Sequence, residues 1–445
     1  MKRSAWRYLW SAQDIRRKLL ITLGILAIYR LAAHVPVPGA DRNVIAGILQ
    51  GGGAQGTLVG ILDLLSGGTV SNFSVLAMGV YPYITAQIIL QLLVPIIPAL
   101  QKRMEDDPRE GRKWMEKWTY YLAVPMALLQ AIGQINIFSS FAGQPIIENF
   151  GFSGANFIPS LTIVLSMTAG TMFAIWLGEL ISEFGIRNQG LSLIIFAGIV
   201  TQIPANIASL WADEQRRFIT IPVLVLLMVL IIFAIVFVQQ GRRNVPVMYP
   251  GRRMGNRMSM PVKGTLPLMV NMAGMIPLIF AQSLLTFPAI LASFFTQSSV
   301  EWLRNLATSI QNLFGGQGAL YYILYFLMVV GFTFFYTNVL FTQQNYGENL
   351  KRVGAQIPGV SRGAPTQKYL TKVLSRITLP GALFLGLVAI LPWLIGLIIP
   401  GLGQNSTLLV SSAGLLIVVG VVRDTFFNIE AELKLHGYDD ALLVR

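Results

Sequence analysis

The strongest constraint in this sequence is a series of ten long apolar runs separated by polar stretches. Each run has about 20 residues, the length of an α-helix that crosses ~30 Å of hydrocarbon. The chain has 445 residues, of which 54% are hydrophobic and only 12% are charged, too few charges for the surface of a soluble protein of this size. We therefore expect an all-α polytopic membrane protein with ten transmembrane helices. The runs lie near residues 19–38, 74–97, 119–138, 157–178, 190–209, 217–239, 266–291, 319–341, 377–399 and 408–422.

The basic residues predict the orientation of these spans. An even number of spans places both termini on the same side, and Lys and Arg are enriched in cytoplasmic loops. Of the 33 Lys and Arg residues, 28 fall on the side of the termini, four fall on the opposite side, and Arg30 lies inside the first run. We therefore expect both termini in the cytoplasm. Two long basic loops, 241–265 and 342–376, should project on the same side.

The stretch from Leu62 to Leu93 combines a short apolar fragment, a glycine break at 67–68 and a long apolar helix. This helix carries Thr85, Gln87 and Gln91, polar side chains that a helix surrounded by lipid would not carry. Broken helices and polar stripes at membrane depth occur where they line a cavity. The stretch therefore predicts a central cavity within the membrane.

The ten runs divide into two sets of five, residues 1–209 and 210–445, in which the second and seventh runs occupy matching places. Both matching runs contain an interior proline close to polar side chains, Pro82 in one and Pro277 in the other. Corresponding interrupted helices in two halves are typical of inverted repeats around a central site. The alternative is that proline and glycine are simply frequent in membrane helices.

The chemistry that the sequence lacks narrows the function. There is no cysteine and there are two histidines, and no nucleotide-binding glycine motif is visible. We expect no catalytic residues, no metal and no cofactor, so the chain should not be an enzyme. A secondary transporter for a small solute remains the alternative, although ion coupling usually requires ionisable groups deep in the membrane. An aliphatic constriction that excludes water suits a varied polymeric substrate better.

Several long motifs occur in order along the whole chain. They are GVYPYITAQIILQLL at 79–93, WLGE at 176–179 with SEFGI at 182–186, LIIFAGIV at 193–200, VNMAGMIP at 270–277 with Phe287-Pro288, and PVPG at 36–39. Together these motifs resemble the SecY family, the channel subunits of the protein-export translocon. The resemblance implies a passive channel that moves unfolded secretory polypeptides across the bacterial cytoplasmic membrane. It also implies that transmembrane segments are released laterally into lipid.

The resemblance implies three sets of site residues. A plug near 56–72 would block the closed pore with Leu62, Leu65, Ser66, Gly67 and Gly68. An aliphatic pore ring would consist of Val80, Ile84, Leu191, Ile195, Ile279 and Ile417. A lateral gate between the second and seventh spans would be lined by Thr85, Gln87, Gln91, Asn271, Gln282 and Ser283.

The resemblance also implies partners. Small membrane subunits similar to SecE and SecG would bind the chain, signal sequences and nascent chains would pass through it, and anionic lipids would surround it. The SecA motor ATPase or a translating ribosome would dock on the basic loops, although those charges could reflect topology alone. The docking residues would be Arg242, Arg243, Arg252, Arg253, Arg257, Lys351, Arg352, Arg362 and Lys368. Arg362 lies one place later than the family's usual loop arginine.

Overall fold

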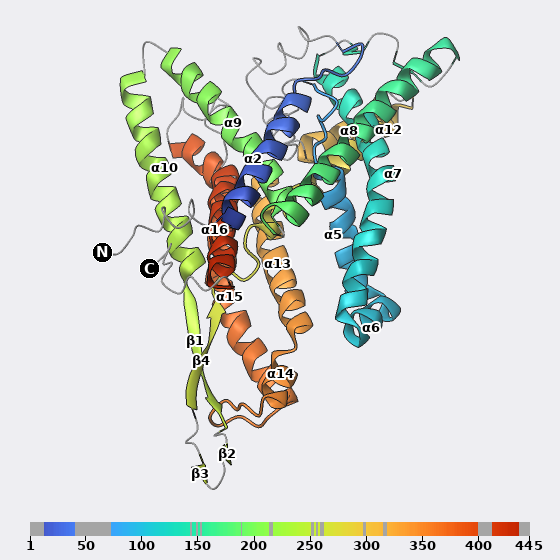
Figure 1. Cartoon of the computed structure of the whole chain (residues 1–445). Coiled ribbons are helices and arrows are strands. Elements are labelled where there is room, and N and C mark those ends of the chain that lie inside the picture. Colours follow the sequence, from blue (N-terminus) through green and yellow to red (C-terminus); the bar gives the residue numbers. More distant parts are fainter. Residues whose placement is uncertain are drawn as a thin grey trace.

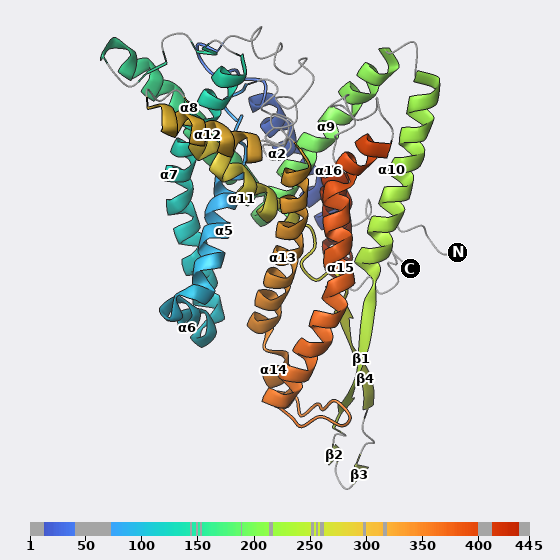
Figure 2. The same ribbon diagram turned by 180° about the vertical axis from the view of Figure 1, so that it is seen from behind.

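Long helices arranged roughly side by side make up most of the computed structural model of the protein (Figures 1 and 2). The structure describes residues 13–40, 73–142, 145–147, 150–151, 154–187, 189–212, 217–250, 253–254, 257–258, 262–296, 300–314, 318–398 and 412–435.

Each of the ten apolar runs overlaps one helix of the described chain. These helices are α2 (Gln13–Ala32), α5 (Tyr81–Ile96), α7 (Pro108–Ala142), α8 (Phe157–Phe184), α9 (Gly190–Ala212), α10 (Arg217–Gln240), α11 (Ile276–Ser293), α13 (Ala319–Gln344), α15 (Ala364–Ile398) and α16 (Ser412–Leu435). Shorter elements lie between them: α6 (Pro98–Asp106), the 3₁₀ turn Gly154–Asn156, α12 (Glu301–Phe314) and α14 (Tyr346–Arg352).

Length and composition identify fewer spans than the ten apolar runs. Within the described part of the chain, five helices are long and apolar enough to cross a membrane. The pair α5 and α6 would add a sixth if it were counted as one span, but the two helices meet at an angle of 99°. Pro95 and Pro98 flank this bend, and proline cannot donate the backbone hydrogen bond that would continue a helix. The ten-span topology therefore stays a prediction.

Helices α5 and α11 begin later than their apolar runs predict. The second run was expected from residue 74 and the seventh from residue 266, whereas the helices start at Tyr81 and Ile276. Each helix follows a glycine with left-handed backbone, Gly79 (φ +51°) or Gly274 (φ +64°), and has a proline in its first turn. Glycine adopts this conformation without strain, and proline is tolerated where the N–H has no helical acceptor. The two matching helices therefore share one Gly-x-x-Pro start signal.

The basic loop 241–265 is a β-hairpin, which corrects the all-α expectation. Strand β1 (Arg242–Tyr249) pairs antiparallel with β4 (Val262–Met269), and two short strands, β2 (Arg253–Met254) and β3 (Arg257–Met258), pair beyond them. Val245 and Val247 of β1 and Leu268 of β4 are buried between exposed neighbours. This alternation of buried and exposed residues is typical of a β-strand. The sequence does not reveal it, because the end of β4 falls within the apolar run expected from residue 266.

The second basic loop, 342–376, is also largely structured, contrary to the loop expectation. Helix α13 continues to Gln344, α14 follows, and α15 begins at Ala364. The hairpin joins this region through two backbone hydrogen bonds between Met248 and Gln356, with N···O distances of 2.8 and 2.9 Å. A separate apolar cluster of the hairpin, α13, α14 and α15 lies beneath these bonds. The two basic segments therefore form one folded unit.

The main apolar cluster joins helices from both halves of the chain. Within it, helix α5 of the first half packs against α7 and against α11 of the second half. The turns before α5 cross α8 at Gly170, where an added methyl group would overlap the carbonyl oxygen of Val75. Glycine at this position therefore fixes how closely the start of α5 approaches α8.

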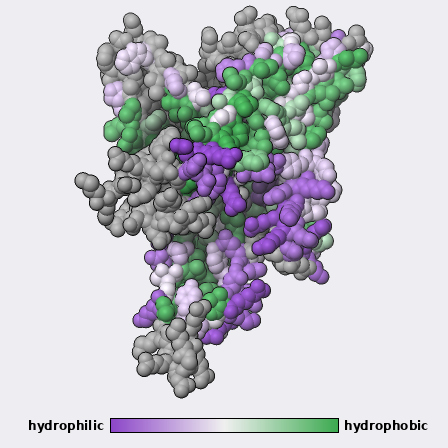
Figure 3. All heavy atoms as spheres, in the orientation of Figure 1, coloured by the Kyte–Doolittle hydropathy of each residue, from purple (hydrophilic) through white to green (hydrophobic). Residues whose placement is uncertain are grey.

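Hydrophilic and hydrophobic side chains separate along the molecule (Figure 3). Purple hydrophilic atoms gather toward the end that carries α6, α14 and the hairpin, and green hydrophobic atoms predominate toward the other end of the helices. Many large apolar side chains are exposed on single helices, including Phe233 and Phe237 of α10 at 72% and 73%. Lipid is the solvent in which such a surface is stable.

Candidate functional site

The site is built on the seam between α5 and α11, which come from opposite halves of the sequence. At this seam the Tyr81 hydroxyl of α5 donates a hydrogen bond of 3.1 Å to the backbone carbonyl oxygen of Ser283 in α11. Both residues are buried, with 4% and 1% of their surface exposed. A hydrogen bond between two helices in an apolar surrounding holds them in one register. The seam is closed in this structure.

A second polar group lies one turn along α5. The Thr85 hydroxyl donates to the Tyr81 carbonyl oxygen at 3.0 Å and accepts from the Gln130 side-chain amide of α7 at 3.3 Å. Thr85 and Gln130 are buried, with 6% and 2% of their surface exposed. Tyr81 and Thr85 therefore join three helices, because α5 bonds to α11 through one residue and to α7 through the other.

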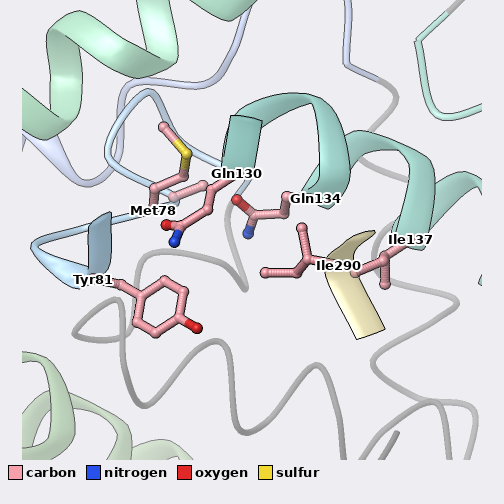
Figure 4. A pocket seen from close by; sticks show the side chains of 7 residues that line it. Met78, Tyr81, Gln130, Gln134, Ile137 and Ile290 are labelled. Carbon is pink, nitrogen blue, oxygen red and sulfur yellow. The ribbon is translucent and has the colours of Figure 1, made fainter. Parts of the chain in front are cut away.

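Figure 4 shows the space next to this group, where Gln130 and Gln134 of α7 approach Met78 and Tyr81. The cavity holds about 10 Å³ and is lined in addition by Ala77, Ile137 and Ile290. A volume of this size accommodates about one water molecule. The side-chain oxygen of Gln130 is buried there without a partner among the described residues. The cavity therefore has no room for a molecule larger than water in this structure.

On the other side of the seam, α11 is fastened to α13. The Tyr325 hydroxyl of α13 donates a 3.1 Å hydrogen bond to the Gln282 side-chain oxygen of α11. Phe280 of α11 makes edge-to-face contacts with Phe332 and Tyr336 of α13, at ring-centroid distances of 6.2 and 5.7 Å. Helices α11 and α13 therefore share both polar and aromatic contacts.

The residues expected to line the lateral gate do not all lie at the seam. Thr85, Gln282 and Ser283 are buried on α5 and α11 as described. Gln87 and Gln91 are half-buried on α5, and the side-chain oxygen of Gln91 has no partner among the described residues. These polar groups are consistent with a seam that opens, but their role in gating stays a prediction.

Asn271 has a different place from the one that the apolar run suggested. It precedes α11, and its side-chain amide donates a 3.1 Å hydrogen bond to the Gly274 carbonyl oxygen. Its side chain therefore shapes the turn from which α11 starts. The seventh span was expected from residue 266, and the late start of the helix explains why Asn271 lies outside it.

Sequence reasoning missed Tyr81 and Gln130. Tyr81 carries no signal of its own in the sequence, because an isolated tyrosine in an apolar run has no preferred partner there. Gln130 and Gln134 form an i, i+4 pair inside the third apolar run. That spacing places both amides on one face of a helix, which was the available indication of a polar contact.

The six aliphatic residues expected in a pore ring come from four helices. They are Val80 and Ile84 at α5, Leu191 and Ile195 of α9, Ile279 of α11 and Ile417 of α16. Five of them are buried members of the main apolar cluster, and Leu191 packs half-buried against it. Membership of one cluster brings them together without defining a common axis, so the ring stays a prediction. The expected plug residues, Leu62, Leu65, Ser66, Gly67 and Gly68, lie outside the described residues.

The expected docking residues lie around the hairpin, α14 and the start of α15. The exposed members are Arg242, Arg243, Lys351, Arg352, Arg362 and Lys368. Arg252 and the side chains of Arg253 and Arg257 lie outside the described residues. Arg362 lies in the turn between Gly359 (φ +78°) and Gly363 (φ +88°), so two left-handed glycines shape the segment that presents it.

Comparison with known proteins gives this arrangement a family. The sequence model described as SecY matches residues 74–426, which include α5, α11 and the basic unit. The chain belongs to the SecY family. It is 37% identical over 453 residues to the protein translocase subunit SecY of Streptomyces coelicolor, with 99% of each chain covered.

Two solved structures share the SecY fold with this chain. One is described as a protein conducting channel, with a TM-score of 0.64 and 17% identity. The other comes from work on how the plug domain of the SecY protein stabilises the closed channel and maintains a membrane seal, with a TM-score of 0.63 and 18% identity. In each case 96% of this chain and 94% of the solved chain are covered.

Proposed function

We propose that this chain is a passive protein-conducting channel that moves unfolded secretory polypeptides across a membrane and releases transmembrane segments sideways into lipid. The observation that carries the proposal is the α5–α11 seam, where a buried hydrogen bond from the Tyr81 hydroxyl to the Ser283 carbonyl oxygen links the two helices. Membership of the SecY family, whose relatives are protein translocase subunits, supports it.

The seam has the properties that a lateral gate needs. A hydrophobic signal helix that enters between α5 and α11 would replace one interhelical hydrogen bond and a layer of apolar contacts. Breaking one such bond costs about 1 kcal/mol, which the transfer of a few apolar side chains into the seam can offset. The polar side chains of Thr85 and Ser283 at the seam would then set how hydrophobic a segment must be to open the gate.

The aliphatic residues near the seam would form the seal. In our proposal Ile84 and Ile279, with the other expected ring members, close around a translocating chain and exclude water from the resting pore. The plug around Leu62–Gly68 would cover this ring from the outer side. Aliphatic side chains impose no sequence requirement on the polypeptide, which suits a channel that carries many substrates.

The charge distribution supports a topology for the proposed channel. We propose ten spans in two inverted halves around the pore, with both termini in the cytoplasm of a bacterial cell and the chain in its cytoplasmic membrane. The count of 28 basic residues against four supports this orientation. The shared Gly-x-x-Pro start of α5 and α11 supports the repeat, because corresponding helices of two halves keep corresponding start signals.

The folded basic unit would receive partners in the cytoplasm. The hairpin and the α14–α15 segment carry exposed basic side chains, to which SecA or a translating ribosome could bind. SecE-like and SecG-like subunits would cover other parts of the helices, and anionic lipids would surround them. Contacts of clustered arginines with ribosomal phosphates would weaken as salt concentration rises.

A photocrosslinking experiment tests the channel function. A photoreactive amino acid at Ile84 should crosslink to a secretory chain that is arrested during translocation. The same amino acid at Phe237 of α10, whose side chain is 73% exposed on the outside of the helices, should give no crosslink to that chain and serves as the control. A properly inserted protein that yields no crosslink at Ile84 contradicts the proposed pore and favours a transporter of small solutes.

A further inference from the structure

An open groove between α13 and α15 has no place in the proposed channel. It holds about 430 Å³ and lies near the α14 end of both helices. Its polar lining consists of Thr337, Asn338, Thr371, Ser375 and Thr378. Hydroxyl and amide groups are rare on a membrane helix surface unless they face a partner, because each one left unpaired in an apolar environment is costly.

Two of these hydroxyl groups lack a partner. Thr337 and Thr378 are 3% and 2% exposed, and neither hydroxyl has a hydrogen-bond partner among the residues that the structure describes. Thr333, one turn before Thr337 on the same helix, is buried and donates to the Val329 carbonyl oxygen at 2.7 Å. A threonine within a helix commonly donates its hydroxyl group to the carbonyl oxygen one turn earlier. Thr333 makes this hydrogen bond, whereas Thr337 and Thr378 do not.

One face of α15 next to the groove changes abruptly from basic to apolar. Lys368, Lys372 and Arg376 are exposed and spaced four residues apart. Leu379, Leu383 and Leu387 continue the same face and are 50%, 42% and 50% exposed. Basic side chains followed by lipid-exposed leucines mark the boundary between head groups and hydrocarbon. Thr371, Ser375 and Thr378 lie beside this boundary, which places the groove at head-group depth.

The charges around the groove select an anion. Neither α13 nor α15 contains an aspartate or glutamate. The nearest acidic residue along the chain, Glu348 of α14, forms an ion pair of 3.7 Å with Lys351. The groove offers hydroxyl and amide donors, and Lys372 and Arg376 lie at adjacent positions of α15. Such a set suits the oxygens of a phosphate group, because hydrogen bonds between charged partners are stronger than those between neutral ones.

We propose that this groove binds a membrane phospholipid, with its phosphate head group held by Thr337, Asn338 and Thr378. Lys372 and Arg376 favour an anionic head group from the adjacent positions of α15. Phe334 and Phe335, which also line the groove, contact the start of the acyl chains. The bound lipid fastens α13 to α15, and α13 is the helix to which α11 is fixed.

Native mass spectrometry of the full-length protein, titrated with phosphatidylglycerol, tests this site. Replacing both threonines by valine keeps their shape and removes two hydroxyl groups, so T337V/T378V should bind the tightest lipid more than tenfold more weakly, from roughly a factor of five for each hydrogen bond. The control T333V removes a buried hydroxyl group that is already paired and should leave lipid affinity unchanged. Thermal melting of the three proteins confirms that each is folded.

Four outcomes would overturn the proposal. One is equal lipid affinity of T337V/T378V and T333V. Another is displacement of the lipid by inorganic phosphate alone at equal concentration, which would identify a phosphate-ion site. The third is a crosslink from a photoreactive group at Asn338 to a single-span membrane protein, which would identify a helix as the occupant. As a second variant, K372Q/R376Q should reduce the preference for phosphatidylglycerol over phosphatidylcholine, and an unchanged preference also contradicts the proposal.

Discussion

Replacing Tyr81 by phenylalanine should open the α5–α11 seam more easily. The change removes the hydroxyl group that donates to the Ser283 carbonyl oxygen at 3.1 Å and leaves the aromatic ring in place. One net hydrogen bond contributes about 1 kcal/mol, so the ratio of closed to open gate should fall about fivefold. The α5–α7 hydrogen bond between Thr85 and Gln130 should persist, because it does not use the hydroxyl of Tyr81.

Translocation of a precursor with a weakened signal sequence into proteoliposomes measures this shift. Such a precursor is limited by gate opening, so Y81F should transport it several times faster than the native protein does. Transport of a precursor with a strong signal should change little. Spin labels at Gln87 on α5 and Leu284 on α11 should show a larger population of long distances in Y81F.

Tyr325 provides the matched control. Its hydroxyl group also makes a buried 3.1 Å hydrogen bond, but the acceptor is Gln282 and the bond joins α13 to α11 within one half. Y325F should therefore cost similar stability without increasing transport of the weak precursor. Equal transport by Y81F and Y325F, or unchanged spin-label distances in Y81F, would refute the assignment of the Tyr81 hydrogen bond to the gate.

Two further predictions concern a close backbone contact at Gly170 and an ion pair between α2 and α16. Gly170→Ala should lower the melting temperature of the purified protein, because the added methyl group overlaps backbone and overpacking costs roughly 1–3 kcal/mol. The control Gly331→Ala, whose methyl group meets open space, should be neutral or slightly stabilising. Equal effects of the two changes would contradict the close approach at α8. The Lys18–Glu432 ion pair joins α2 to α16 across the two halves. Reversing the charge of either partner should destabilise the protein by up to about 1 kcal/mol, a small effect because both side chains are partly exposed. In a double-mutant cycle, K18E/E432K should recover most of the lost stability.

The apolar runs located the long helices, because burial in lipid requires about 20 apolar residues in sequence and leaves a local pattern. The same pattern failed where two kinds of structure were equally hydrophobic. The run expected from residue 266 contains the end of strand β4, a turn with Asn271 and only then α11. Local hydrophobicity cannot separate these elements, and the left-handed Gly274 was the informative residue.

The polar groups of the candidate site were only partly predictable. Thr85, Gln282 and Ser283 stand out in the sequence because polar side chains are expensive in an apolar helix. Their partners do not stand out, because a hydrogen bond between residues 202 positions apart depends on which helices become neighbours. The pairing of Tyr81 with the Ser283 carbonyl, in particular, uses a backbone acceptor that any residue could have supplied.

The sequence by itself determined the membrane character of this protein, the places of its long helices and the asymmetry of its basic residues. These properties follow from composition and local spacing, which need no knowledge of neighbours. Only the tertiary structure decided that a basic loop is a β-hairpin, that α5 is bonded to both α7 and α11, and that Thr337 and Thr378 share a groove. Each of these results depends on packing between distant segments, which many sequences of the same pattern could satisfy in different ways.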